Sequence, residues 1–251
     1  MHTQEDPSCP ICRHATALYD VVDFNKSCVE ASGTFLPLSG VPIYYRRCPD
    51  CGHTWAPEFR EWSSEDFLNH IYNEDYVTVD PDYVSARPQG QAQLVTQLFG
   101  ARREHIRHLD YGGGAGGLSS LLRGQGWDSD SFDPFPGDGT RLETLGKFNF
   151  ITAFEVFEHV PDVDSLMTNL TALMDEECLV MFSTLLNDAN VLPNGRLNWW
   201  YASPRNGHIS LFSKQSLALL AERYGLGFRS FNESLHCFCS TMPAWVGLPR
   251  G

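Results

Sequence analysis

Hydrophobic and polar positions follow three successive patterns along this chain. In residues 1–60, short β-like runs such as "VPIYYRRC" are separated by Cys, Pro and Gly without helical periodicity, which is typical of a small, loop-rich module. Residues 61–87 turn acidic and aromatic and predict short helices. The pattern then becomes helical, with Pro88 in the first turn and Leu94, Val95, Leu98 and Phe99 on one face.

Beyond residue 104, short apolar strands alternate with helices. Strands are expected at "HIRHLDY", "WDSDSFDPF", "FNFITAF" and "ECLVMFSTL", and helices at "GLSSLLRGQ", "EHVPDVDSLMTNLTALM" and "SKQSLALLAERYG". The segment "GFRSFNESLHCFCS" closes the series with a hairpin-like pair. This alternation predicts an α/β fold with a doubly wound, mostly parallel sheet and an antiparallel edge.

The length of 251 residues suffices for one sizeable core plus a small appended module. We therefore expect a zinc ribbon in residues 1–60, a linker or lid in 61–87 and the α/β domain in 88–251. The chain shows neither a signal peptide nor an apolar run of about 20 residues, so we expect a cytoplasmic protein without a membrane partner.

The net charge is −13, from 18 basic and 31 acidic residues. Such an excess of acidic side chains disfavours DNA or RNA as a partner. The local basic run "ARREHIRH" would spread around a helix and is interpreted as a solvated face. A small-molecule partner is expected, and the oligomeric state is left open.

The stretch "LDYGGGAGG" places a glycine-rich loop directly after the first predicted strand of the alternating series. It satisfies the dinucleotide pattern G-x-G-x-x-G at Gly112, Gly114 and Gly117. It equally satisfies D-x-G-x-G-x-G at Asp110, Gly112, Gly114 and Gly116. The glycines let the backbone approach a ligand at a helix N-terminus, but they do not select between the two patterns.

Two carboxylates add information about that ligand. Asp133 ends the next strand and suits ribose hydroxyls in either reading. Asp110 would repel a pyrophosphate but attract the amino end of a methionine moiety. Asp110 therefore favours S-adenosylmethionine over a dinucleotide, although each aspartate could also simply cap a strand end or turn.

Four motifs in order, "LDYGGGAGG", "FDPF", "ITAFEVFEHVPD" and "GHISLFSKQSL", resemble class I S-adenosylmethionine-dependent methyltransferases, which have a Rossmann-like fold. The resemblance covers roughly residues 90–240. It is strongest to the branch that contains ubiquinone-biosynthesis O-methyltransferases and bacterial small-molecule and sugar methyltransferases.

The resemblance implies roles for individual residues. The methionine part of the donor would face Asp110 and the glycines at 112, 114 and 116, and Asp133 would take the ribose hydroxyls. Pro134 and Phe135 would lie near the adenine, and Phe154 and Glu155 would line the floor beneath the methyl group. Only 17 residues separate Asp133 from Ile151, so the crossover between the second and third strands must be abbreviated, and no adenine-binding acidic residue can be placed in it.

Two C-x-x-C pairs lie in the N-terminal module, at Cys9 and Cys12 and at Cys48 and Cys51. Four thiolates make a complete tetrahedral site for Zn²⁺, with no open position, so such a metal would be structural. Disulfides and redox pairs compete with this interpretation, but a reducing cytosol disfavours the former. His14, Cys28 and His53 are alternative ligands, and Cys178, Cys237 and Cys239 are interpreted as core residues.

Methyl transfer is an in-line displacement, and a hydroxyl or carbon acid acceptor needs a base. We predict His208, in "RNGHISLFS", as the base and His159, in "FEVFEHVPD", as an auxiliary or alternative group. Both histidines could instead be structural. Glu158 is expected at a helix start.

Aromatic residues in two segments are candidates for the acceptor pocket. The run Trp199, Trp200 and Tyr201 suggests a pocket wall with a planar or apolar component, or, for one of the tryptophans, core packing. A second set, Tyr72, Tyr76 and Tyr83, could form a lid that excludes water, or join the N-terminal module to the rest.

The sequence therefore predicts an S-adenosylmethionine-dependent methyltransferase acting on a small molecule such as a sugar, quinone or secondary metabolite. Three alternatives stay open at this point. They are a ribosomal-RNA or other nucleic-acid methyltransferase that reads its substrate through the ribbon, an NAD(P)-dependent oxidoreductase, and a non-catalytic ligand-binding module.

Overall fold

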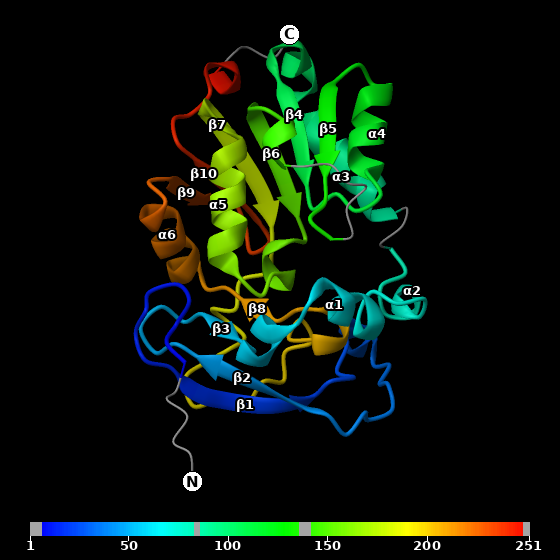
Figure 1. Ribbon diagram of the computed structural model, residues 1–251, viewed down its shortest axis with the longest axis vertical. Helices are drawn as coiled ribbons and strands as arrows, with labels where there is room; N and C mark the ends of the chain where they lie inside the picture. The colour runs from blue at the N-terminus through cyan, green and yellow to red at the C-terminus, as the bar shows by residue number, and fades with distance from the viewer. Residues whose placement is uncertain (1–6, 83–85, 136–141, 248–251) are drawn as a thin grey trace. The chain divides into compact units, whose positions relative to one another are not determined.

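The computed structural model describes residues 7–82, 86–135 and 142–247 and divides into two compact units (Figure 1). Unit 1 comprises residues 1–80, 158–164 and 185–223, and unit 2 comprises 81–157, 165–184 and 224–251. Both units are therefore assembled from segments that are discontinuous in sequence. Tyr83 lies outside the described residues.

Unit 2 contains a six-stranded sheet in the order β5-β4-β6-β7-β10-β9. Its parallel strands are β4 (Arg107–Tyr111), β5 (Asp128–Phe132), β6 (Phe148–Phe154) and β7 (Met174–Ser183). The hairpin of β9 (Gly227–Ser230) and β10 (Leu235–Cys239) pairs antiparallel with β7. The predicted α/β class, with a mostly parallel sheet and an antiparallel edge, is confirmed.

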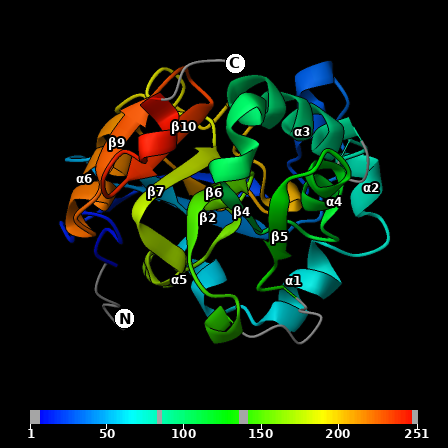
Figure 2. The same ribbon diagram turned by 90° about the horizontal axis from the view of Figure 1, so that it is seen from above.

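Helices cover both faces of this sheet. Helices α3 (Ala86–Phe99) and α4 (Gly117–Gly124) lie on one face, and α5 (Val163–Leu173) lies on the other (Figures 1 and 2). Alternating residues of β6 explain the two cores, because Phe150 and Phe154 pack with α3 and α4 while Ile151 and Ala153 are buried from the other side.

The connection from β5 to β6 was expected to be abbreviated, because only 17 residues separate Asp133 from Ile151. Residues 136–141 of this crossover lie outside the described residues. The remainder contains a single 3-10 turn, η4 (Leu142–Thr144).

Unit 1 contains an antiparallel sheet in the order β1-β2-β3-β8. Its strands are β1 (Ala17–Asp23), β2 (Pro42–Arg47), β3 (Thr54–Trp55) and β8 (Ser210–Leu211). The last strand comes from a segment about 150 residues later in the chain, which also supplies α6 (Lys214–Arg223).

Shorter elements complete unit 1. Helix α1 (Ser64–His70) begins with a capping box in which Ser63 and Asp66 satisfy each other's backbone N–H groups. It is followed by α2 (Tyr76–Val79), and 3-10 turns include η1 (Cys28–Ser32), η2 (Pro57–Glu61), η5 (Phe157–His159) and η6 (Pro204–Asn206). Within the described ranges, no helix combines the length and apolar character that crossing a bilayer requires.

Candidate donor, metal and acceptor sites

The glycine-rich loop of unit 2 joins β4 to α4 and lies close to neighbouring side chains. Gly112, Gly114 and Gly116 all have positive φ angles, of 74°, 54° and 75°. A Cβ on Gly112 would lie 2.5 Å from Val156, and one on Gly113 would lie 2.4 Å from the Ser131 hydroxyl. Side chains are therefore excluded here, and the exposed backbone at the start of α4 forms a cradle for a ligand.

Asp110 lies at the end of β4 beside this cradle and is only 5% exposed. Its Oδ1 is 2.8 Å from the hydroxyl of Thr152 on β6. Burial and, to a lesser extent, the nearby carboxylate of Asp133 raise the pKa of Asp110 to about 7, against the opposing effect of the hydrogen bond with Thr152. A nearby cation would strongly stabilise the ionised form of such a buried carboxyl. The ammonium group of a methionine moiety is a cation of this kind.

Asp133, which was expected to take ribose hydroxyls, binds the backbone of the glycine-rich loop. Its Oδ2 accepts from the Gly114 N–H at 2.7 Å, and its Oδ1 accepts from the Phe135 N–H at 2.8 Å. Burial raises the pKa of this carboxyl, while these two N–H groups lower it. A carboxylate offers about four lone pairs, so the same oxygens can also accept from ribose hydroxyls.

The other residues assigned to the donor differ in their surroundings. Pro134 is exposed and Phe135 is half-buried, whereas Phe154 packs in the hydrophobic core. Glu155 adopts the left-handed conformation, with φ 54°, which is unfavourable for a residue with a side chain. Ser183 holds it there, because its hydroxyl accepts from the Glu155 N–H at 2.8 Å and donates to Oε1 at 2.7 Å.

The four cysteines of the two C-x-x-C pairs meet in unit 1, with all four sulfurs within 4.8 Å of one another. The Sγ atoms of Cys9 and Cys51 are 3.6 Å apart, and those of Cys12 and Cys48 are 3.4 Å apart. Tetrahedral Zn–S bonds of about 2.3 Å require sulfurs about 3.8 Å apart. All the cysteines are free thiols, so the donor set and its spacing fit zinc.

The two cysteine pairs have the same backbone turn. Cys9 N–H donates to the His14 carbonyl and Cys48 N–H donates to the His53 carbonyl, both at 2.8 Å. The residue after the second cysteine is left-handed in each, with φ 67° at Arg13 and 74° at Gly52. The repeated geometry matches a pair of metal-binding knuckles.

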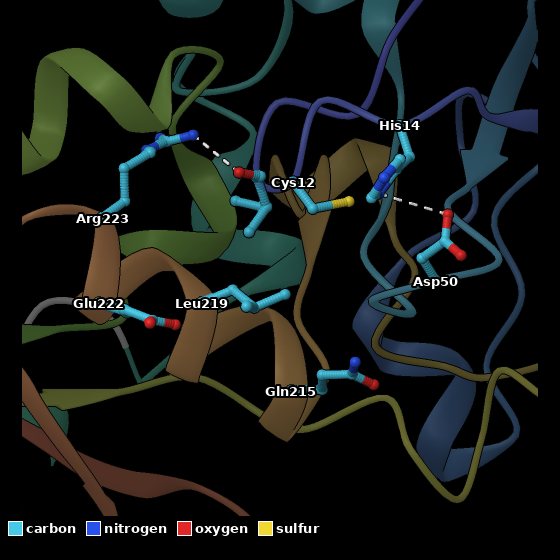
Figure 3. A pocket seen from close by; sticks show the side chains of 8 residues that line it. Cys12, His14, Asp50, Gln215, Leu219, Glu222 and Arg223 are labelled. Carbon is cyan, nitrogen blue, oxygen red and sulfur yellow. Dashed lines mark hydrogen bonds and ion pairs between the residues drawn. The ribbon is translucent and has the colours of Figure 1, made fainter.

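Helix α6 packs beside the first knuckle, and a pocket of about 400 Å³ lies between them (Figure 3). Arg223 donates to the carbonyls of Pro10 and Ile11 at 2.9 and 2.8 Å, and Asp164 pairs with both Arg13 and Arg223. Across the pocket, His14 pairs with Asp50 at 3.5 Å. His14 is therefore engaged outside the group of four cysteines, and Cys28 lies elsewhere, 3.0 Å from the Ser203 hydroxyl.

The two candidate catalytic histidines come together in unit 1, with ring centroids 4.8 Å apart. His208 precedes β8 and is 6% exposed, and its Nδ1 is 2.8 Å from the Tyr201 carbonyl. Because a carbonyl only accepts, Nδ1 carries the hydrogen, and Nε2 carries the lone pair in the neutral ring. That is the tautomer a general base requires.

Glu158 and two tyrosines complete this group. Glu158, expected at a helix start, lies fully buried in the first turn of the 3-10 helix η5, five residues before α5, and accepts a hydrogen bond from the Tyr201 hydroxyl. His159 Nδ1 is 3.2 Å from the Tyr72 hydroxyl. Glu158, His159 and His208 offer ligand atoms within 4.8 Å of one another.

Sequence reasoning missed the role of Tyr201 and Tyr45 in this group. Tyr201 was considered only as a pocket wall, yet its ring lies 4.2 Å from that of His208 and its hydroxyl binds Glu158. Tyr45 donates to the His208 carbonyl at 2.6 Å. No short sequence motif could have indicated either pairing, because the partners are 43 and 163 positions apart in the chain.

A family model described as "Methyltransferase domain" matches residues 83–230. Comparison with curated proteins finds no match.

Three solved structures illustrate what the chain is similar to. An O-methyltransferase family protein from Burkholderia thailandensis is 14% identical over 75% of this chain and 71% of its own, with a TM-score of 0.47. Magnesium protoporphyrin IX methyltransferase from Synechocystis PCC 6803 is 15% identical over 74% and 97%, with a TM-score of 0.42. An S-adenosylmethionine-dependent methyltransferase from Thermotoga maritima is 12% identical over 69% and 100%, with a TM-score of 0.45.

Proposed function

Because the chain belongs to the methyltransferase domain family, and is thus an S-adenosylmethionine-dependent methyltransferase, we propose that it methylates a small molecule with an acidic hydroxyl or carbon. A sugar, a quinone-type ring or another secondary metabolite meets this description. The net charge of −13 supports this choice over a nucleic-acid acceptor, since phosphates would be repelled.

The observation that carries the proposal is the buried carboxyl of Asp110 beside a backbone cradle that admits no side chain. Asp110 binds the ammonium group of the methionine moiety, and the loop glycines at 112, 114 and 116 admit the rest of it. Asp133 takes the ribose hydroxyls, with Pro134 and Phe135 near the adenine. A dinucleotide is disfavoured because its pyrophosphate would face Asp110 and Asp133 together.

The donor supplies an electrophilic methyl group on a sulfonium. During transfer the sulfur–carbon bond breaks as the bond to the acceptor forms, and the acceptor loses one proton. His208 takes this proton at Nε2, since the Tyr201 carbonyl holds the hydrogen of Nδ1 in place. His159 is the auxiliary group, and its Tyr72 contact restricts the orientation of the ring.

Cys9, Cys12, Cys48 and Cys51 hold one Zn²⁺ in unit 1 under this proposal. Four thiolates leave no open coordination position, so the metal stabilises the module and takes no part in methyl transfer. The repeated backbone turn and the spacing of the sulfurs support it.

Calorimetric titration with S-adenosylhomocysteine, NAD and NADP tests the donor. We expect binding of S-adenosylhomocysteine alone, and a loss of at least about 100-fold in affinity in Asp110→Ala, because a charge-assisted contact in a buried site is removed. Asp128→Ala removes an exposed aspartate at the start of β5 and serves as the charge-matched control. Binding of NAD in place of S-adenosylhomocysteine would refute the proposal.

Methyl transfer to a panel of sugars, quinols and phenols tests the acceptor class and the base. His208→Ala should lower kcat by about 100-fold or more while leaving S-adenosylhomocysteine affinity unchanged. His159→Ala should have a smaller effect. Equal effects of both variants on kcat would contradict the assignment of His208 as base, and transfer to RNA alone would refute a small-molecule acceptor.

A further inference from the structure

Five buried polar side chains form a continuous hydrogen-bonded chain in unit 2. Asp110 Oδ1 is 2.8 Å from Thr152 Oγ1, which is 2.9 Å from His108 Nε2. His108 Nδ1 is 2.8 Å from Ser129 Oγ, which is 3.0 Å from Ser119 Oγ. The chain thus runs from the donor loop through β6, β4 and β5 to α4.

The number of hydrogens on these five side chains determines which group donates and which accepts in each hydrogen bond. Each hydroxyl has one hydrogen to donate, and a neutral imidazole has one. Ser119 donates its hydrogen to the carbonyl of Asp130, at 2.5 Å, so Ser129 must donate to Ser119. Ser129 then has no hydrogen left for His108, and His108 must donate from Nδ1.

The count of hydrogens also fixes the protonation of Asp110. With its hydrogen on Nδ1, His108 accepts at Nε2 from Thr152, and Thr152 has no second hydrogen for Asp110. Every contact is then satisfied only when Asp110 is a protonated acid that donates to Thr152. An ionised Asp110 requires the reverse arrangement, with the His108 hydrogen on Nε2, and leaves the contact between Ser129 and Ser119 without a hydrogen.

We propose that Thr152 and His108 are positioning residues that couple binding of the methyl donor to the release of one proton from Asp110. This rests on the proposed role of Asp110 in holding the donor's ammonium group. When that group arrives, the O–H bond of Asp110 breaks and its proton leaves to solvent. The Thr152 hydrogen turns to Oδ1, and the imidazole hydrogen changes from Nδ1 to Nε2, so the chain holds one hydrogen fewer.

The surroundings of the chain agree with this coupling. Burial raises the pKa of Asp110 to about 7 and lowers that of His108 to about 3, so below pH 7 Asp110 is mostly protonated and His108 is uncharged before binding. Among the described residues of unit 2, the carboxylate of Asp133, at the end of β5, acts on Asp110, and Arg123 of α4 donates to the Ser129 carbonyl at 2.8 Å. Asp133 opposes ionisation of Asp110, so a cationic ligand must supply the compensating charge.

Titration calorimetry with S-adenosylhomocysteine, in buffers of different ionisation enthalpy, measures the released proton. We expect close to one proton per site at pH 5.5 and about half a proton at pH 7.0. Affinity should fall about tenfold per pH unit below 7, since Asp110 must first be ionised. Binding without proton release across this range would overturn the inference.

Thr152→Val removes the hydroxyl that stabilises the ionised carboxylate. Its affinity for S-adenosylhomocysteine should be about tenfold lower at pH 7.0, with the pH dependence moved upward, and Thr152→Ser should restore both. Thr171→Val is the matched control, because the Thr171 hydroxyl binds only carbonyls of its own helix among the described contacts. An unchanged pH profile in Thr152→Val would overturn the inference.

Nitrogen-15 NMR of the His108 imidazole tests the inference in the wild-type protein. The result therefore does not depend on whether a variant folds. We expect the His108 hydrogen on Nδ1 in the free protein and on Nε2 when S-adenosylhomocysteine is saturating; one tautomer in both states would overturn the inference. If S-adenosylhomocysteine fails to bind at any pH, the proposed donor site falls together with this inference. Binding without proton release removes the inference alone.

Discussion

Two of the candidate sites of this protein are built in opposite ways. The part of the proposed donor site that would hold the methionine moiety lies within seven consecutive residues of unit 2, Asp110 and the loop glycines at the end of β4. The histidine group of unit 1 collects Tyr45, Tyr72, the Glu158–His159 pair and the Tyr201–His208 segment. A site contained in one loop leaves a sequence motif, whereas a site assembled from four segments leaves only isolated residues.

The same difference applies to the metal group, which lies between these extremes. Each knuckle is local, but the group of four thiols requires two knuckles 35 residues apart to meet. The following predictions test how strongly each kind of site depends on its distant contacts.

The largest effect is expected for the cysteine group. Cys48→Ser removes one of the four proposed zinc ligands, and structural zinc contributes on the order of 10 kcal/mol to the folding of small modules. Zinc content should fall below one per chain, and the free energy of unfolding should fall by roughly 3 kcal/mol or more. Elemental analysis and chemical denaturation check this, with Cys239→Ser in the half-buried end of β10 as the control. Reduced wild-type protein without zinc would contradict it.

Asp110→Asn should stabilise the protein in the absence of donor. The folded-state pKa of about 7 exceeds the ordinary value of 3.8, so the wild type loses stability as pH rises from about 4 to 7. An asparagine at this position cannot ionise, so the variant does not lose stability over this pH range. Its free energy of unfolding should exceed that of the wild type by about 2–4 kcal/mol at pH 8. At pH 5 the gain should be less than half as large. Urea unfolding at both pH values checks this, and an equal gain at both would contradict it.

Tyr201→Phe tests the histidine group through its buried carboxyl. The variant removes the hydroxyl that donates to Glu158 and accepts from the Leu185 N–H at 3.3 Å. We expect a loss of about 2 kcal/mol in the free energy of unfolding, because a buried carboxyl loses a donor. Tyr44→Phe, at an exposed position on β2, is the control. Equal stability of the two variants would show that Glu158 does not depend on Tyr201.

The smallest effect is expected where the two knuckles differ. Arg13→Gly relieves a left-handed residue, worth roughly 1 kcal/mol, but loses an exposed ion pair with Asp164 worth about 0–1 kcal/mol. The net change in the free energy of unfolding should therefore be below about 1 kcal/mol. Gly52→Ala should be clearly worse, since its Cβ would also lie 3.1 Å from Ser213. Equal losses in the free energy of unfolding would contradict this prediction, because a side chain at the left-handed position of either turn would then carry no cost.

Several features could be read from the chain because they depend on near neighbours. The alternation of strands and helices follows from side-chain periodicity, and the donor loop follows from glycines whose positive φ angles other residues avoid. Asp110 was identifiable since it ends the strand before these glycines. The cysteine pairs were identifiable by their spacing.

Other features were decided only when distant segments packed together. The pairing of β3 with β8 joins residues about 155 positions apart and places α6 in unit 1. The partners of Asp110 and Glu158 lie 42 and 43 positions away. No local pattern encodes such pairs, because their meeting depends on strand register and on which faces are buried together. The sequence by itself determined the glycine-rich loop after Asp110 and the two pairs of cysteines; the tertiary structure decided which hydrogen-bond partners surround Asp110 and which nitrogen of His208 carries the hydrogen.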